Sequence, residues 1–128
     1  MDSTTTMQDL KDAVRDMCLH RGWGGERAIQ DPQHMAMAMV IEQGELMEQF
    51  AWLDADGVQA LLDGRLPNRR AHIAEELADV LLYSVQIARA LDIDLADAML
   101  RKIEVVKRRR DDPDYGRSHP HLYSDEED

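Results

Sequence analysis

The sequence predicts an all-α protein, a helical bundle of four main helices. Apolar residues recur at spacings of three and four in several long segments, whereas no segment alternates apolar and polar residues for long. Residue types that favour strands are scattered along the chain and do not form runs. The 128 residues, 44% of them apolar and 32% charged, suit one globular domain.

Two long helices are expected in the first half of the chain. The first begins near Thr5 or Thr6, where Thr5 and Gln8 fit a capping box, and ends at the glycines of 22–25. The second begins with Asp31 as its cap and Pro32 in its first turn. Its apolar positions continue through Leu53, so we expect it to reach the turn at 54–57.

In the second half of the chain, the sequence predicts a short helix at 58–64 and two further long helices. The third helix runs from about Arg70 to Leu91, and its apolar residues on most sides favour a central position in the bundle. The fourth begins at Asp94 and fades in the basic run 107–110. We therefore expect one helical domain over 1–110 and an acidic, flexible tail over 111–128.

Composition excludes several classes of function. The formal charge of −11 opposes binding to polymeric DNA or RNA. The longest apolar run, Met35 to Ile41, is too short to cross a membrane. The first residues lack the pattern of a secretory signal, and Cys18 is the single cysteine, so we expect a cytoplasmic protein without disulfides.

Four carboxylates lie where helices should be apolar. At about 100° per residue, Glu42 falls in the middle of the apolar stripe of the second helix, and Glu45 lies on the same side. Glu76 is central in the third helix, and Asp79 flanks it in the same way. Burying four unpaired carboxylates would cost several kcal/mol each. A compensating cation is therefore expected.

A divalent metal is the simplest such cation. Glu42, Glu45, Glu76 and Asp79 offer only hard oxygen ligands, which favours Mg²⁺, with Mn²⁺ as the alternative, over Zn²⁺. An E-x-x-E pair taken alone is usually solvated surface charge, but here two pairs are centred on apolar stripes.

Cations share the apolar side of the fourth helix. Lys102 falls among Leu95, Met99 and Val106, and Arg109 lies close to the same direction. Either these side chains neutralise an acid or extend to solvent, or they contact phosphate. Acids, a metal and one or two cations together suit a polyphosphate ligand.

These residues resemble the MazG-like all-α nucleoside triphosphate pyrophosphohydrolases, and within them the small dCTP pyrophosphatase-like branch. The resemblance covers most of the chain. It rests on Arg21-Gly22-Trp23, Pro32-Gln33-His34-Met35, the run from Glu42 to Trp52, the run from Glu75 to Tyr83, and Lys102-Ile103.

The resemblance implies that the chain hydrolyses a nucleoside triphosphate to the monophosphate and pyrophosphate. Glu42, Glu45, Glu76 and Asp79 would be the magnesium ligands and catalytic residues, and Glu45 would orient or deprotonate a water. It further implies a phosphate contact for Lys102 and nucleotide contacts for three aromatic residues, Trp23, Trp52 and Tyr83.

Departures from the family pattern bear on the choice of base. Two extra residues separate Trp23 from Pro32, Val106 stands where Asn is usual, and Arg110-Asp111 replaces a common Tyr-Pro pair. We therefore predict activity on several nucleotides, with dCTP-like pyrimidines as the favoured group.

The sequence argues against one rival function and leaves two alternatives open. A ferritin-like di-iron protein also has inward acids, but its E-x-x-H signature is missing. A dUTPase or phosphoribosyl-ATP pyrophosphohydrolase would keep the metal chemistry with another substrate. An acidic helical interaction module would carry the same acids as surface charge.

Assembly into oligomers is expected. Helices that carry inward acids leave a short monomer with little dry core, and the third helix needs more cover than this chain supplies. The resemblance implies a homodimer or homotetramer, in which methionines of the second helix would contribute to the contact.

Overall fold

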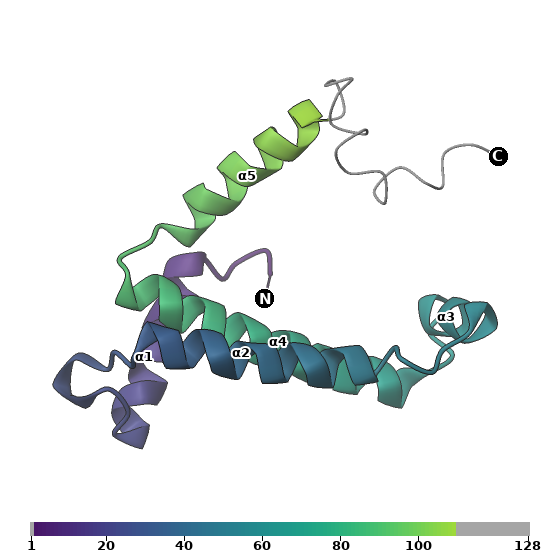
Figure 1. Cartoon of the computed structure of the whole chain (residues 1–128), viewed down its shortest axis with the longest axis horizontal. Helices are drawn as coiled ribbons and strands as arrows, with labels where there is room; N and C mark the ends of the chain where they lie inside the picture. Colours follow the sequence, from purple (N-terminus) through teal and green to yellow (C-terminus); the bar gives the residue numbers. More distant parts are fainter. Residues whose placement is uncertain (1, 110–128) are drawn as a thin grey trace. The chain divides into compact units, whose positions relative to one another are not determined.

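The computed structural model describes residues 2–109, and its regular secondary structure over that range consists of helices without strands (Figure 1). The expected fold class is therefore confirmed. The elements, in chain order, are α1 (Met7–Arg21), the short 3-10 helix η1 (Gly25–Arg27), α2 (Pro32–Glu48), α3 (Ala55–Leu62), α4 (Pro67–Ala90) and α5 (Leu95–Arg109).

The first helix begins one residue later than the predicted capping box. Thr6 is the N-cap, and its hydroxyl accepts a bond of 3.1 Å from the Asp9 backbone N–H. The Asp9 carboxylate accepts in return from the Thr6 backbone N–H at 2.7 Å. The predicted Thr5–Gln8 pair is wrong, because Asp9 forms the same reciprocal bonds from Thr6. At the other end Gly22 adopts a left-handed φ of 69° and closes the helix, as the glycines predicted.

Helix α2 begins as predicted and ends early. The Asp31 carboxylate accepts bonds from the Gln33 and His34 N–H groups at 2.8 and 3.1 Å, ahead of Pro32. The helix stops at Glu48, so the predicted extension through Leu53 is wrong. At this end Arg69 Nη1 donates to the Gln49 carbonyl oxygen at 2.8 Å, a carbonyl that the helix leaves without an intrahelical partner.

Helices α3 and α4 both start earlier than the sequence predicted. Asp54 caps α3 through a bond of 2.8 Å from the Gly57 N–H, so this helix begins at Ala55. Helix α4 begins at Pro67, three residues before the expected Arg70, and Leu66 provides no side-chain cap. Proline at a first helical position explains this start, since its missing N–H has no intrahelical partner to lose.

Helices α2 and α4 lie side by side over most of their lengths (Figure 1). The two helices run antiparallel. Arg69 near the start of α4 bonds to Gln49 at the end of α2, while Ser84 Oγ, late in α4, contacts Met39 Sδ in the first half of α2 at 3.4 Å. This register decides which side chains of the two helices meet.

The core is small and lies toward the end of α4. Cys18 and Val85 are completely buried, and Gln86 is buried with them. The Gln30 side-chain amide donates to Gln86 Oε1 at 2.6 Å, and the Cys18 thiol contacts the same oxygen at 3.7 Å. This polar network joins α1, α4 and the segment before α2. The central helix α4 still exposes Leu77 and Leu81, so the neighbours in one chain only partly provide the cover expected for it.

The chain divides into two compact units between Ile93 and Asp94. The second unit contains α5, which begins after Asp94, whose carboxylate accepts from the Asp97 N–H at 2.9 Å. This start agrees with the prediction. The tail predicted for 111–128 lies outside the described residues, and no described helix is long and apolar enough to cross a bilayer.

Candidate metal centre

The predicted acids of α2 and α4 come together across the antiparallel pair. Single carboxylate oxygens of Glu42, Glu45 and Glu76 lie within 4.8 Å of one another. Glu42 and Glu45 are three residues apart on α2, as are Glu76 and Asp79 on α4, so each pair projects from one side of its helix. The first unit therefore holds a group of carboxylates built from two helices.

Burial of these acids is uneven. Glu42, Glu76 and Asp79 are half-buried, whereas Glu45 is exposed. The expectation that all four acids point into a buried stripe is thus met only in part.

The environment raises the pKa of two of the glutamates. Burial is the largest cause for Glu42, followed by the negative charges of Glu45, Asp79 and Glu76. Burial also raises the pKa of Glu76 most, and the charges of Glu45 and Asp79 add to it, while His72 opposes the shift. Asp79 is therefore electrostatically part of the cluster, although it is not among the three closest oxygens.

One oxygen of the cluster has no protein partner. The buried Oε2 atom of Glu76 forms no hydrogen bond within the described part of the chain. A buried acceptor without a donor loses the hydrogen bonds that it would make with water. An orphaned oxygen among converging carboxylates fits a bound divalent cation, whose preferred ligands are such hard oxygens.

The raised pKa values predict how the stability of the metal-free protein depends on pH. Because Glu42 and Glu76 hold protons more tightly when folded, their contribution favours the folded state at low pH. It is lost as the pH rises from about 4, the ordinary range of glutamate, through the raised values. We expect the melting temperature in EDTA to fall over this window, apart from the general effect of acid on other groups.

Added Mg²⁺ or Mn²⁺ should reverse that loss, because ligand binding to the folded state alone stabilises it. The measurement is a thermal melt at a series of pH values with and without metal. The variant Glu42→Gln provides the control, since it removes one of the titrating groups. A metal-induced increase in melting temperature that is equally large at pH 4 and pH 8 would contradict a carboxylate site.

The chain was then compared with known proteins. The model of the MazG-like family matches residues 37–116, a range that contains all four acids. The chain belongs to the MazG-like family. This finding confirms the resemblance drawn from Glu42, Glu45, Glu76 and Asp79.

Similar proteins give the MazG-like chain further context. It is 35% identical over 104 residues to human dCTP pyrophosphatase 1 and 33% identical over 109 residues to the bovine protein of that name. These matches cover 81% and 84% of the chain but only 58% and 60% of the relatives. The chain thus spans about three fifths of the length of these curated relatives.

A solved structure shares the fold over most of the length of both chains. The crystal structure of a pyrophosphatase from Archaeoglobus fulgidus superposes with a TM-score of 0.66 at 31% sequence identity. The match covers 84% of the MazG-like chain and 92% of the archaeal chain. The overall helical fold is therefore shared with an experimentally determined structure.

The aromatic residues predicted to contact the nucleotide do not gather in one place. Tyr83 is half-buried on α4, one turn beyond Asp79 and on its side of the helix. Trp52 is 92% exposed in the turn after α2. Trp23 lies before α2, where its ring stacks on the Arg21 guanidinium at 4.7 Å.

The two tryptophans lie at opposite ends of α2. The backbone of Trp23 bonds to Cys18 O, and Cys18 contacts the Gln86 network next to the start of α2. Trp52 follows the end of that helix. Since 17 residues of helix extend roughly 25 Å, one nucleotide cannot stack on both tryptophans of the same chain.

The predicted phosphate contacts lie in the other unit. Lys102 and Arg109 are both on α5, which begins a unit of its own at Leu95. Their role at a phosphate is untested and stays a prediction.

Sequence reasoning missed a basic pocket beside the acids. It is an open pocket of about 470 Å³ whose lining includes Gln49, Arg65, Asn68, Arg69 and His72. Two signals were present in the sequence. Three of the six residues from Arg65 to Arg70 are arginines in an acidic chain, and His72 precedes Glu76 by one helical turn.

Proposed function

We propose that the chain is a magnesium-dependent nucleoside triphosphate pyrophosphohydrolase. The observation that carries the proposal is the convergence of Glu42, Glu45 and Glu76 within 4.8 Å, with an orphaned oxygen on Glu76. The reaction would convert a ribo- or deoxyribonucleoside triphosphate and water into the monophosphate and pyrophosphate. Cytoplasmic housecleaning of nucleotides is the role that we propose for it.

All four carboxylates would hold the metal, and one of them would also act on the water. Glu42, Glu45 and Glu76, whose oxygens converge, would bind Mg²⁺ together with the neighbouring Asp79, with Mn²⁺ as a substitute. When bound, the metal neutralises phosphate charge and lowers the pKa of a coordinated water. Glu45 is exposed and would orient the attacking water and accept its proton. The bond between the α- and β-phosphates breaks, and pyrophosphate leaves with the bridging oxygen.

The favoured substrates are dCTP-like pyrimidine nucleotides. Two relatives at 33–35% identity are named dCTP pyrophosphatase 1. Tyr83 is placed beside the acids on α4, and the exposed Trp52 offers a free aromatic face for stacking on a base. Val106 in place of a usual Asn removes side-chain hydrogen bonding at that position, so we expect several bases to be accepted.

Product analysis after incubation with Mg²⁺ and a panel of nucleoside triphosphates tests the function. The panel includes dCTP, dUTP, modified pyrimidines and ribonucleotides, and phosphorus NMR identifies the products. We expect monophosphate and pyrophosphate from several pyrimidine nucleotides. A preference above about a thousandfold for dCTP would contradict the expected breadth, which allows only differences of the size set by single lost contacts.

The same panel tests the alternatives. Turnover confined to dUTP would indicate a dUTPase, and turnover of phosphoribosyl-ATP would indicate that branch of the superfamily. Release of inorganic phosphate in place of pyrophosphate would contradict the proposed bond cleavage. No turnover of any nucleotide by a protein that still binds Mg²⁺ would leave the metal centre and remove the proposed reaction.

We further propose that the protein is a homodimer or homotetramer. Large apolar residues of α2 are exposed in the single chain, namely Met37, Val40, Ile41 and Met47 at 61–63% of their surface. Contiguous apolar surface of this kind is typical of an interface. Because Trp23 and Trp52 of one chain lie too far apart to stack on one nucleotide, a second tryptophan at that nucleotide would have to come from a second copy of the chain.

Sedimentation at micromolar concentration measures the assembly. We expect a mass of two or four chains. The variant Met37→Glu places a charge on the exposed face and should shift the protein toward the monomer, whereas Gln8→Glu on the exposed side of α1 should not. A monomeric wild-type protein would contradict this proposal without affecting the metal centre.

A further inference from the structure

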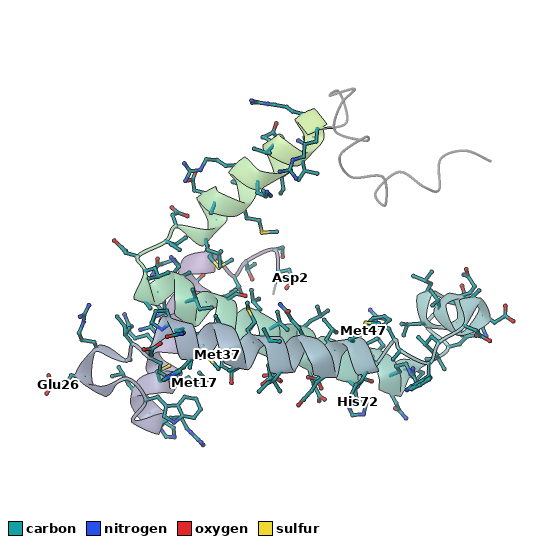
Figure 2. The ribbon with its side chains drawn as sticks, in the orientation of Figure 1. Asp2, Met17, Glu26, Met37, Met47 and His72 are labelled. Atoms are coloured by element: carbon teal, nitrogen blue, oxygen red, sulfur yellow. The ribbon has the colours of Figure 1, made fainter. Side chains whose placement is uncertain are left out.

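The basic pocket lies one helical turn from the carboxylate cluster on both helices. Gln49 follows Glu45 by four residues on α2, and His72 precedes Glu76 by four residues on α4. Each pair therefore stacks along one side of its helix, separated by about 5–6 Å. In Figure 2, His72 lies at the end of the pair where α2 ends and α4 begins.

Charge in the pocket is opposite to that of the cluster beside it. Arg65 and Arg69 contribute guanidinium groups, and His72 contributes a ring that becomes cationic when protonated. Arginine keeps its charge at every relevant pH and presents several N–H donors in a fork that matches phosphate. Two arginines thus line one pocket in a chain whose net charge is −11.

The present partners of these side chains are weak and replaceable. Arg65 pairs with Asp63 at 3.1 Å, and both side chains are exposed. Arg69 uses Nη1 for the Gln49 carbonyl oxygen, which holds its guanidinium at the pocket wall and leaves its other donors for a ligand. His72 pairs with Glu75 at 3.2 Å on the exposed surface. Exposed ion pairs of this kind contribute little to stability, so a multiply charged anion would displace them.

Backbone groups add to the same polarity. Helix α4 is 24 residues long, and Leu66 supplies no side-chain cap for its first N–H groups. Asn68 and Arg69, the first residues after Pro67, line the pocket. Their N–H groups have no intrahelical acceptor at these positions, and they lie at the positive end of the helix dipole.

We propose that this pocket binds the terminal phosphates of the nucleoside triphosphate, and the pyrophosphate that leaves. The proposal rests on the proposed hydrolysis and adds the part of the substrate that this pocket recognises. A triphosphate held with its inner phosphates at Glu42, Glu45 and Glu76 would reach one helical turn along α2 and α4. Arg65 and Arg69 would then receive its outer charge. The cluster and the pocket together match a ligand that needs both a metal and cations.

Isothermal titration with inorganic pyrophosphate in EDTA tests the pocket without metal or catalysis. We expect saturable binding by the wild-type protein that is at least about tenfold weaker for Arg65→Gln, since a charge-assisted hydrogen bond is worth at least that factor. Arg69→Lys keeps the charge but loses the forked donors, and should weaken binding as well. The matched control is Arg15→Gln on α1, an exposed arginine paired with Asp12 and Asp16, which should leave the affinity unchanged.

Inorganic phosphate and dCMP are the further ligands of the titration. Preference for pyrophosphate over both supports recognition of the terminal phosphates. The proposal would be overturned if inorganic phosphate bound as tightly as pyrophosphate, or if pyrophosphate did not bind at all. It would also be overturned if Arg15→Gln weakened pyrophosphate binding as much as Arg65→Gln does. If the pocket binds pyrophosphate but no nucleotide is hydrolysed, the proposed function fails and the pocket stands. If nucleotides are hydrolysed with the same KM by Arg65→Gln and wild type, the pocket fails and the function stands.

Discussion

Replacing Glu42 by Gln should abolish metal binding and turnover while making the metal-free protein more stable. Glu42 is half-buried among Glu45, Glu76 and Asp79, and burial together with their charges raises its pKa. A Gln of the same shape removes a metal ligand and also a repelled charge. We expect kcat to fall by more than about 100-fold, because loss even of outer partners of metal ligands typically costs 10–100-fold.

Two measurements separate this result from simple unfolding. Titration with Mn²⁺ should show no saturation in Glu42→Gln, and its melting temperature in EDTA at pH 7 should exceed that of the wild-type protein. The control is Glu48→Gln, which changes the last residue of α2, an exposed acid outside the cluster. Unchanged metal binding in Glu42→Gln would remove the metal centre and favour the alternative of an acidic interaction module.

Replacing Gly24 by Ala should destabilise the fold more than any other substitution of a glycine before α2. Gly24 has a φ of 75°, and an added Cβ would lie 2.5 Å from the Ile29 carbonyl carbon and oxygen. The loop cannot easily move aside, because Ile29 bonds to Gly24 O at 3.3 Å and Arg89 donates to Ala28 O at 2.9 Å. We expect a loss of about 3 kcal/mol or more in the free energy of unfolding.

Gly25→Ala is the matched control for that loss. Its φ of 64° carries the same left-handed strain, but nothing lies within 4 Å of an added Cβ. Chemical denaturation should therefore show a loss of only about 1–2 kcal/mol for Gly25→Ala. Equal losses in the two variants would mean that backbone conformation alone decides, and that the close approach of Ile29 is relieved by a small shift.

Local signals in the sequence were enough to predict the helices and the two pairs of acids. Asp31 and Pro32 predicted the start of α2 because capping is a contact between near neighbours in sequence. The spacing of Glu42 and Glu45, and of Glu76 and Asp79, placed each pair on one side of its helix for the same reason. That the two pairs meet required the register of α2 against α4, which no periodicity within one helix contains.

Tertiary contacts decided the remaining features. Helix α2 ends at Glu48, where Arg69, 20 positions beyond Gln49, bonds to the Gln49 carbonyl, whereas the apolar pattern through Leu53 predicted a longer helix. The separation of Trp23 from Trp52 follows instead from the helix between them, which the sequence already predicted.

The sequence by itself determined the all-α class and the order of the helices, because capping and periodicity act over a few residues. That the acids bind a metal through oxygen ligands stays a prediction from side-chain chemistry. Only the tertiary structure decided that Glu42, Glu45 and Glu76 converge, and that Glu76 keeps an oxygen without a partner. It also placed a pocket lined by Arg65 and Arg69 beside them, with its residues Gln49 and His72 one turn from the acids. Those features depend on how residues distant in the chain pack together, and packing is set by the whole antiparallel pair.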